Sequence, residues 1–452
     1  MKASMLFCAA LVVAILPGAA ARAEDDDGAR LLEDLRYLAQ DATLVADTRG
    51  SYFTDRGLPT GGVASAQGAI RLEIAGAILD NWEVALTPEF NWSAESGIVG
   101  GEITLSERGR VRPVLGMAEA WVAWSDGPWT VKAGKQVFAW GNSDLLSLSD
   151  DLNASDKLDL PWAYKLGAPA LAVSHATADL GVDLVVIPTF TPDRLPGLTS
   201  PWARSRAPVA DAAFVQTGIR PDVVDGARDL PGGTDGVQVG LRATSSAMLE
   251  ATDLSVSAFH GVSRTPVLLP RFVSPTVLAL DSFYPRYTEF AMGFSTIVSD
   301  FEFHGEAAMH VTERSDEDDD YLSYVIGMRR EWSDLGRDDI DTVRVTLEYA
   351  GEMITRHISD SSPYIRSNFD RTATNSVLGK LDLEFDVNTT LTVGGALNFE
   401  DGDYAVDAML EHKLNDRVTL SAGFQMFAGP SQSFFGEWSN NDRAYVGLKM
   451  YW

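Results

Sequence analysis

Hydrophobic and polar side chains alternate along most of the chain. In residues 443–452, one set of alternate positions is apolar and consists of Ala444, Val446, Leu448, Met450 and Trp452. Residues 417–426 repeat the pattern, with Leu420 and Phe424 in the apolar set. Successive side chains of a β-strand point to opposite faces. The alternation therefore predicts strands with one apolar and one polar face.

The chain contains eighteen segments of this kind, each about ten residues long. This is the length of a tilted strand that crosses a bilayer. We expect the strands to begin near residues 42, 67, 82, 116, 129, 169, 181, 235, 253, 288, 300, 321, 341, 376, 389, 403, 417 and 443. A soluble β-sandwich also alternates. Aromatic residues at the ends of the apolar faces favour a membrane barrel, whose interfacial girdles they would form: Trp82, Phe90, Trp332, Phe399, Tyr404 and Trp452.

The predicted fold class is therefore all-β: a transmembrane antiparallel β-barrel of about 16–18 strands with long extracellular loops. Short turns at residues 80–81, 298–299, 386–388 and 415–416 would face the periplasm. Longer joins at residues 141–166, 190–233, 264–287 and 355–375 would face outward and either cap the mouth or fold into the lumen. The Pro-rich stretch 188–231 is too irregular for strands, so we expect none there.

The N-terminus has a different character. Lys2, a short apolar run to Leu16 and the small residues Ala21 and Ala23 are typical of a secretory signal peptide, expected to span residues 1–23 and to carry away the only cysteine, Cys8. Residues 24–41 place Leu31, Leu35 and Leu38 on one helical face. They predict either a periplasmic or lumen-plugging helix or a solvated leader to the barrel, residues 42–452.

The net charge and the placement of charged residues limit the classes of function that the protein can have. The net charge of −28 argues against a nucleic-acid partner, which would require a basic surface. The polar strand faces carry both signs of charge, either to wet and select a channel or to fill the interior with ion pairs. The candidate lumen-lining residues are Glu302, Glu306, Arg329, Arg344, Glu348, Lys380, Asp382, Glu384, Asp407, Glu411, Arg417, Arg443 and Lys449.

The sequence predicts no enzyme activity, catalytic residue or cofactor, because it contains no nucleophile elbow, phosphate loop or dinucleotide fingerprint. We predict no metal site either. His304 and His310 share a strand face but lie about 20 Å apart, too far for one ion. The acidic run 313–320 is expected to be a solvated loop, with cation binding as the weaker alternative.

Residues 134–141, Gly-Lys-Gln-Val-Phe-Ala-Trp-Gly, resemble the Gly-x-Gln-x-x-x-Trp-Gly strand end of a large family of Gram-negative outer-membrane barrels. The resemblance continues through residues 151–153, 165–170 and 187–196, but Asn153-Ala154-Ser155-Asp156 replaces the family's usual Asn-Pro-x-Asp. It implies a porin-like protein in which Gln136, Trp140, Asn153, Asp156, Pro188 and Arg194 are the motif and loop candidates. Members are thought to pass organic or hydrophobic compounds, some beside inner-membrane exporters of the RND type.

These observations predict a channel or transporter in the cell outer membrane, surrounded by lipid and lipopolysaccharide, that passes small or amphipathic solutes through a charged lumen. One alternative is the outer-membrane component of a trans-envelope system for lipids or hydrophobic compounds, with periplasmic or inner-membrane partners. The other is a closed structural or receptor barrel. A barrel that conducts no current would argue against an open pore.

Overall fold

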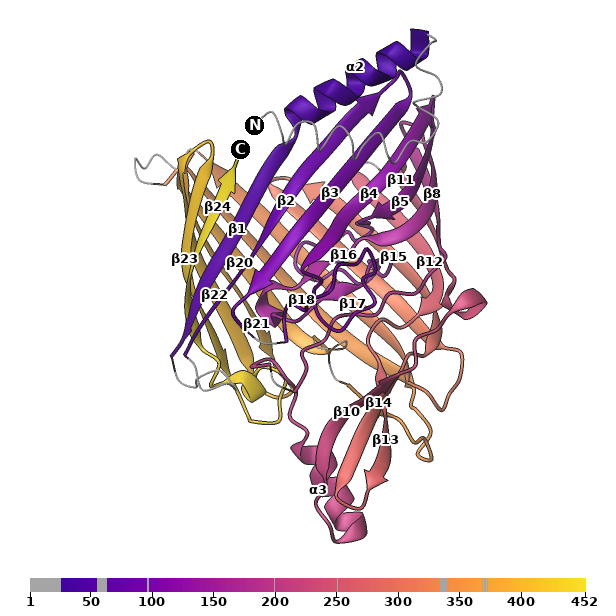
Figure 1. Ribbon diagram of the computed structural model, residues 1–452, viewed down its shortest axis with the longest axis vertical. Helices are drawn as coiled ribbons and strands as arrows, with labels where there is room; N and C mark the ends of the chain where they lie inside the picture. Colours follow the sequence, from indigo (N-terminus) through magenta and orange to yellow (C-terminus); the bar gives the residue numbers. More distant parts are fainter. Residues whose placement is uncertain are drawn as a thin grey trace.

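The protein forms one closed antiparallel β-barrel of 18 strands (Figure 1). The computed structural model describes residues 26–54, 63–95, 97–198, 200–249, 251–333, 340–367, 369, 371 and 373–452. Each strand pairs with its neighbours along the chain, and β1 pairs with the last strand, β24, to close the sheet. The predicted fold class and an even strand number at the top of the expected range are confirmed.

The barrel strands match the eighteen expected segments. They are β1 (Thr43–Phe53), β2 (Ala64–Ile78), β3 (Trp82–Ser93), β4 (Leu115–Asp126), β5 (Trp129–Gln136), β8 (Ala168–Ala176), β9 (Leu180–Ile187), β11 (Gln238–Leu249), β12 (Thr252–Val262), β15 (Arg286–Val298), β16 (Phe301–Thr312), β17 (Asp320–Ser333), β18 (Thr342–Arg356), β20 (Asn375–Asp386), β21 (Thr389–Asn398), β22 (Tyr404–Asn415), β23 (Val418–Ala428) and β24 (Arg443–Tyr451). Local alternation was sufficient to locate them because each strand exposes one face to each side of the wall.

The two ends of the barrel differ. Both ends of the described chain lie at the end where short turns such as residues 79–81, 299–300 and 387–388 join the strands; we call it the turn end (Figure 1). The long connections gather at the opposite end, the loop end. The signal peptide predicted for residues 1–23 lies outside the described residues.

Apolar side chains cover the outside of the wall. Leu420 and Phe424, predicted to point outward, are 41% and 50% exposed. Phe290, Ile326 and Val446 on other strands are exposed in the same way. A water-soluble barrel would hide such side chains, whereas a barrel in lipid exposes them. Among the described residues, no helix has the length and hydropathy needed to cross a membrane.

Helix α2 (Asp26–Asp41) packs on the outer face of the wall near the turn end (Figure 1). Leu35 and Leu38 are buried against Ile74, Ile78 and Leu86, which share the outward face of their strands. An added Cβ at Gly76 would lie 2.6 Å from Leu38 Cδ2, so glycine permits the close approach. Residues 26–41 therefore form a helix, as one of the two predictions for this segment had it. The helix lies outside the lumen and does not plug it.

A small second sheet projects from the loop end (Figure 1). It contains β10 (Asp222–Arg228), β14 (Val277–Phe283), β13 (Val267–Ser274) and β19 (Ile365–Arg366), in that order, beside helix α3 (Ala207–Thr217). The prediction that residues 188–231 contain no strand is wrong, because β10 pairs in parallel with β14. Its partner comes from the distant 264–287 connection, which no local pattern in the Pro-rich stretch indicates.

Candidate functional site

The connection between β5 and β8 enters the barrel; we call residues 137–167 the lumen loop. It contains short strands β6 (Ser155–Asp156) and β7 (Tyr164–Lys165) and the 3-10 helix η1 (Leu160–Trp162). Phe138, Trp140 and Leu152 of this loop pack on the inner faces of β8, β9, β12 and β15, where their neighbours include Val185 and Phe259. Of the two alternatives predicted for the long joins, capping the mouth or folding into the lumen, residues 141–166 adopt the second.

This packing corrects the expectation that only polar residues face the lumen. Residues 168–173 of β8 and 184–187 of β9 are apolar on both faces, and the inward-facing Val185 and Ile187 are 1% and 2% exposed. Gly240 on β11 completes the contact, because an added Cβ would lie 2.8 Å from the Trp140 ring. This side of the barrel contains a protein core instead of a wetted wall.

Two wall carboxylates hold the lumen loop on its opposite side. Glu306 on β16 accepts hydrogen bonds from the backbone N–H groups of Asn142, Ser143, Leu148 and Ser149, at 2.5 to 3.0 Å. The side chain is 4% exposed. Buried carboxylates need several donors to offset lost hydration, and the turn of backbone around Glu306 supplies them.

Glu348 on β18 binds the adjacent part of the loop. Its carboxylate accepts the N–H groups of Asp144, Leu145 and Leu146 at 2.8 to 3.0 Å. The His304 ring lies 2.9 Å away through Nε2 and is fully buried. Glu306 and Glu348 therefore fix residues 142–149 across the lumen. The sequence had left open whether these two residues line a channel or make structural contacts, and the structure shows structural contacts.

An ion network fills the lumen on the β1–β5 side. Asp156 is fully buried and accepts hydrogen bonds from Arg112 and Arg194 at 2.9 to 3.1 Å. Arg194 also pairs with Glu107, which in turn pairs with Lys135 of β5. Because Arg194 belongs to the Pro-rich stretch after β9, the network ties that stretch to the lumen loop.

A second pair joins the lumen loop to the last strand. Asp159 accepts two hydrogen bonds from Arg443 at 2.7 and 3.2 Å, and both side chains are buried. Glu95, in the β3–β4 connection, lies near this pair. Burial and the charge of Asp159 raise the pKa of Glu95 to about 7. Its Oε1 atom is buried without a hydrogen-bond partner among the described residues.

The other motif residues also support the lumen loop. Asn153 donates to the carbonyls of Gln136 and Leu166 and accepts from the Phe138 N–H, at 2.7 to 3.1 Å. Gln136 donates to the Ala170 carbonyl across to β8. Pro188 is exposed after the end of β9 and contributes no hydrogen bond here. Five of the six motif candidates thus meet at the loop, although its Asn-Ala-Ser-Asp differs from the family pattern.

The wall candidates have separate environments. The strand registers place all of the wall candidates except Arg417 on the lumen face. Arg417 is instead exposed in the turn before β23, where its backbone N–H donates a hydrogen bond to the Asn415 side chain. Strand β23 thus begins at Val418, one residue later than predicted. Several of the inward residues form pairs, namely Arg329 with Glu302, Arg344 with Glu331, and Lys380 with Asp382. No ion pair is described for Glu384, Glu411 and Lys449 within the part of the chain covered by the structure.

The prediction of a solvated loop for the acidic run 313–320 holds for residues 313–316, which are exposed or partly exposed, and is wrong for residues 317–320. Glu317, Asp318, Asp319 and Asp320 are each less than a tenth exposed. Asp320 accepts hydrogen bonds from Arg356, and Asp319 accepts one from Arg371 at 2.8 Å. Arginines from distant segments neutralise Asp319 and Asp320, and the nearby Arg314 pairs with Glu317, so mutual repulsion does not keep these carboxylates in water.

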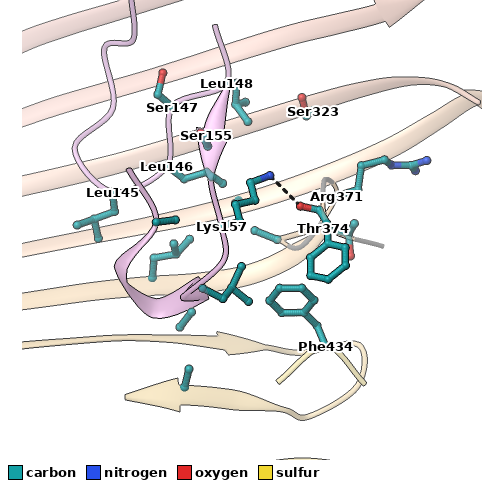
Figure 2. A pocket seen from close by; sticks show the side chains of 18 of the residues that line it. Leu145, Leu146, Ser147, Leu148, Ser155, Lys157, Ser323, Arg371, Thr374 and Phe434 are labelled. Atoms are coloured by element: carbon teal, nitrogen blue, oxygen red, sulfur yellow. Dashed lines mark hydrogen bonds between the residues drawn. The ribbon is translucent and has the colours of Figure 1, made fainter. Parts of the chain in front are cut away.

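A cavity of about 810 Å³ remains between the lumen loop and strands β15 to β23. Figure 2 shows its lining near Lys157, with Leu145, Leu146 and Leu148 on the loop and Phe434 on the other side. Lys157 donates to the Phe369 carbonyl at 3.1 Å and pairs with Asp193 at 2.8 Å. The arrangement offers a permeating molecule both apolar and charged surfaces.

Sequence reasoning missed several residues of this site. Glu107, Arg112, Lys135 and Asp159 complete the ion networks, and Phe427, Phe434 and Trp438 form an aromatic cluster with Trp202 beside the cavity. Lys135 lies inside the motif at residues 134–141, directly before Gln136, so the motif could have identified it as a site residue. The aromatic cluster joins three segments, namely the Pro-rich stretch, β23 and the connection after β23, and no spacing in the sequence relates the first to the other two.

Comparison with known proteins adds a family and distant structural likenesses. No curated protein sequence matches the chain. A mutant porin of Rhodopseudomonas blastica is 12% identical, with 91% of this chain and 99% of the porin covered and a TM-score of 0.41. OpdK of Pseudomonas aeruginosa, solved with vanillate, is also 12% identical over 91% and 99% of the two chains, with a TM-score of 0.46.

The family comparison covers much more than the motif region. The family model described as "Protein of unknown function (DUF1302)" matches residues 99–450, which is more than three quarters of the chain. The matched region includes the lumen loop, the Pro-rich stretch and the strands that carry Glu306 and Glu348. The chain belongs to this family of proteins.

Proposed function

We propose that this protein is a porin-like channel of the outer membrane that passes small or amphipathic solutes. The observation that best supports this proposal is the cavity inside the closed barrel, which is bounded by the lumen loop and by a charged wall. The apolar outer face supports placement in a lipid bilayer, where closure satisfies the backbone groups of every strand. The turn end would then face the periplasm and the loop end the cell exterior.

The lumen loop gives the channel its restricted cross-section. A barrel of this strand number can leave a wide aqueous lumen. Here residues 142–149 cross that lumen and are held by Glu306 and Glu348. Passage is therefore confined to the side of β15–β23, where leucine and phenylalanine side chains face charged groups. This mixture suits solutes with an apolar part and a polar group.

Planar-bilayer recording tests the proposal. The full-length protein, purified in detergent and shown by circular dichroism to be folded, is expected to give discrete current steps in KCl. We expect steps smaller than those of an unobstructed barrel of the same strand number, because the lumen loop occupies part of the section. Folded protein that inserts into the bilayer without conducting would instead favour a structural or receptor barrel.

A further inference from the structure

The cavity presents an aromatic wall and a carboxylate on the same side. Asp407 on β22 pairs in register with Gln425 on β23, and the next inward pair toward the loop end is Ala405 with Phe427. All four side chains line the cavity, together with Phe434 and Phe435 of the connection after β23. Inward-facing residues two positions apart on paired strands lie about 7–8 Å from one another. The Asp407 carboxylate and the Phe427 ring can therefore contact one small molecule.

Asp407 carries a charge that no described cation neutralises by direct contact. Its two oxygens accept hydrogen bonds from the Tyr445 hydroxyl at 3.0 Å and from the Gln425 amide at 3.1 Å. Both donors are neutral. The side chain is partly exposed to the cavity. The same row holds two wall cations, each two strands away: Lys380 across Gly394, and Arg443 across Gln425, to which it donates a hydrogen bond at 2.7 Å. Both are already paired with other carboxylates, Lys380 with Asp382 and Arg443 with Asp159.

The cations that line the cavity are already paired. Among the described lining residues, Lys157 binds Asp193 at 2.8 Å, and Lys380 binds Asp382 at 3.0 Å. Arg264 pairs with Asp151, and Arg371 pairs with Glu352. An anionic solute would have to compete with these carboxylates for each cation. A cationic solute meets Asp407 without displacing an ion pair.

The aromatic wall favours the same charge. The faces of phenylalanine rings attract ammonium groups, and their apolar surface accommodates the carbon atoms around the charge. The protein already uses this contact nearby, since the Arg204 guanidinium lies 5.4 Å from the Phe434 ring centroid. Arg204 is paired with Glu437 at 3.0 Å, which limits its repulsion of a second cation.

We propose that Asp407 and the aromatic wall of Phe427, Phe434 and Phe435 form a subsite for organic cations inside the channel. The inference rests on the proposed channel function and names the class of solute that the cavity selects. Solutes with an ammonium group on an aromatic or branched apolar body fit both elements of the subsite.

The test measures how two charged probes block the potassium current through single channels. Benzyltrimethylammonium carries the favoured charge, and benzenesulfonate is a similarly sized aromatic anion. We expect benzyltrimethylammonium to block at lower concentration than benzenesulfonate. Replacing Asp407 by Asn should weaken the block by the cation about three- to tenfold, as expected for loss of one nearby charge in a partly hydrated site. Phe434→Leu should weaken it about threefold.

Asp211→Asn is the matched control, because Asp211 is exposed on helix α3, beside the projecting sheet, and pairs there with Arg220. It should leave both blocks unchanged. Channels that conduct but respond equally to the two probes, or an Asp407→Asn channel blocked as strongly as the unmodified one, would overturn the organic-cation subsite. Folded protein that gives no current would overturn the channel function itself, so the two failures are distinguishable.

Discussion

Glu95 shows how a single buried carboxyl group can make local stability depend on pH. Its raised pKa of about 7 means that the fold favours the protonated form. The contribution to stability is thus fully present below the ordinary pKa of the group and is lost as the pH rises through about 7. The affected structure is the β3–β4 connection and its contact with Asp159 and Arg443.

We therefore expect Glu95→Gln, which cannot ionise, to protect this connection at alkaline pH. Amide exchange of residues 97–114 should be slower in the variant than in the unmodified protein at about pH 8, and the two should converge near about pH 4. Glu102→Gln, an exposed change in the same connection, serves as control and should have no effect. Slower exchange of the unmodified protein at alkaline pH would contradict this interpretation.

At the scale of elements, the lumen loop depends on charges supplied by the wall. Glu348 accepts three backbone N–H groups, and residues such as Leu145 and Leu146 contribute little else than backbone and an apolar surface. A glutamine in its place keeps the shape but presents an amide N–H₂ group to some of these donors. Each buried donor left unpaired costs about 1–3 kcal/mol.

We expect Glu348→Gln to loosen residues 142–149 without unfolding the barrel. The current should become noisier, with excursions to larger conductance, and amide exchange of the loop should accelerate at least about tenfold, the effect of roughly one lost hydrogen bond. Glu331→Gln is a suitable control, since Glu331 pairs with Arg344 within the wall. A quiet current of unchanged size in Glu348→Gln would show that the loop does not depend on this carboxylate.

At the scale of the whole molecule, closure between the first and last strands decides whether the sheet can reside in lipid. Gly50 of β1 lies directly opposite Val446 of β24, and both face outward. Without this pairing, two strand edges would leave backbone groups unsatisfied in hydrocarbon. The pairing joins residues from the two ends of the chain.

Cysteines placed at this junction should report the closure. We expect Gly50→Cys combined with Val446→Cys to form a disulfide under mild oxidation, seen as a shift in electrophoretic mobility that reductant reverses. The Cα atoms of directly opposed residues on antiparallel strands lie about 4.5–5.5 Å apart, which is within the range that a disulfide spans. Gly50→Cys with Ala422→Cys places the second thiol one strand farther away and should not form one. Equal yields from the two pairs would argue against the observed register.

The sequence by itself determined the strands and the sidedness of the wall. Most of the strands follow from alternation, because a strand's two faces are set by neighbouring residues and by the different solvents on the two sides. Strands β8 and β9 alternate least, because much of their inward face packs against the lumen loop. Leu420 and Phe424 face outward for this reason, as predicted. The motif around Gln136 and Asn153 also indicated where the chain leaves the wall.

Only the tertiary structure decided what the inside of the barrel contains. Asp144 and Glu348 are separated by 204 residues, and β10 finds its partner in another connection, so no local pattern predicts either contact. The same is true of the arginines that pair with Asp319 and Asp320 and of the apolar core on β8 and β9. Alternation predicts which way a side chain points, but the lumen is filled by segments that are far apart in the sequence. Its chemistry therefore depends on three-dimensional proximity.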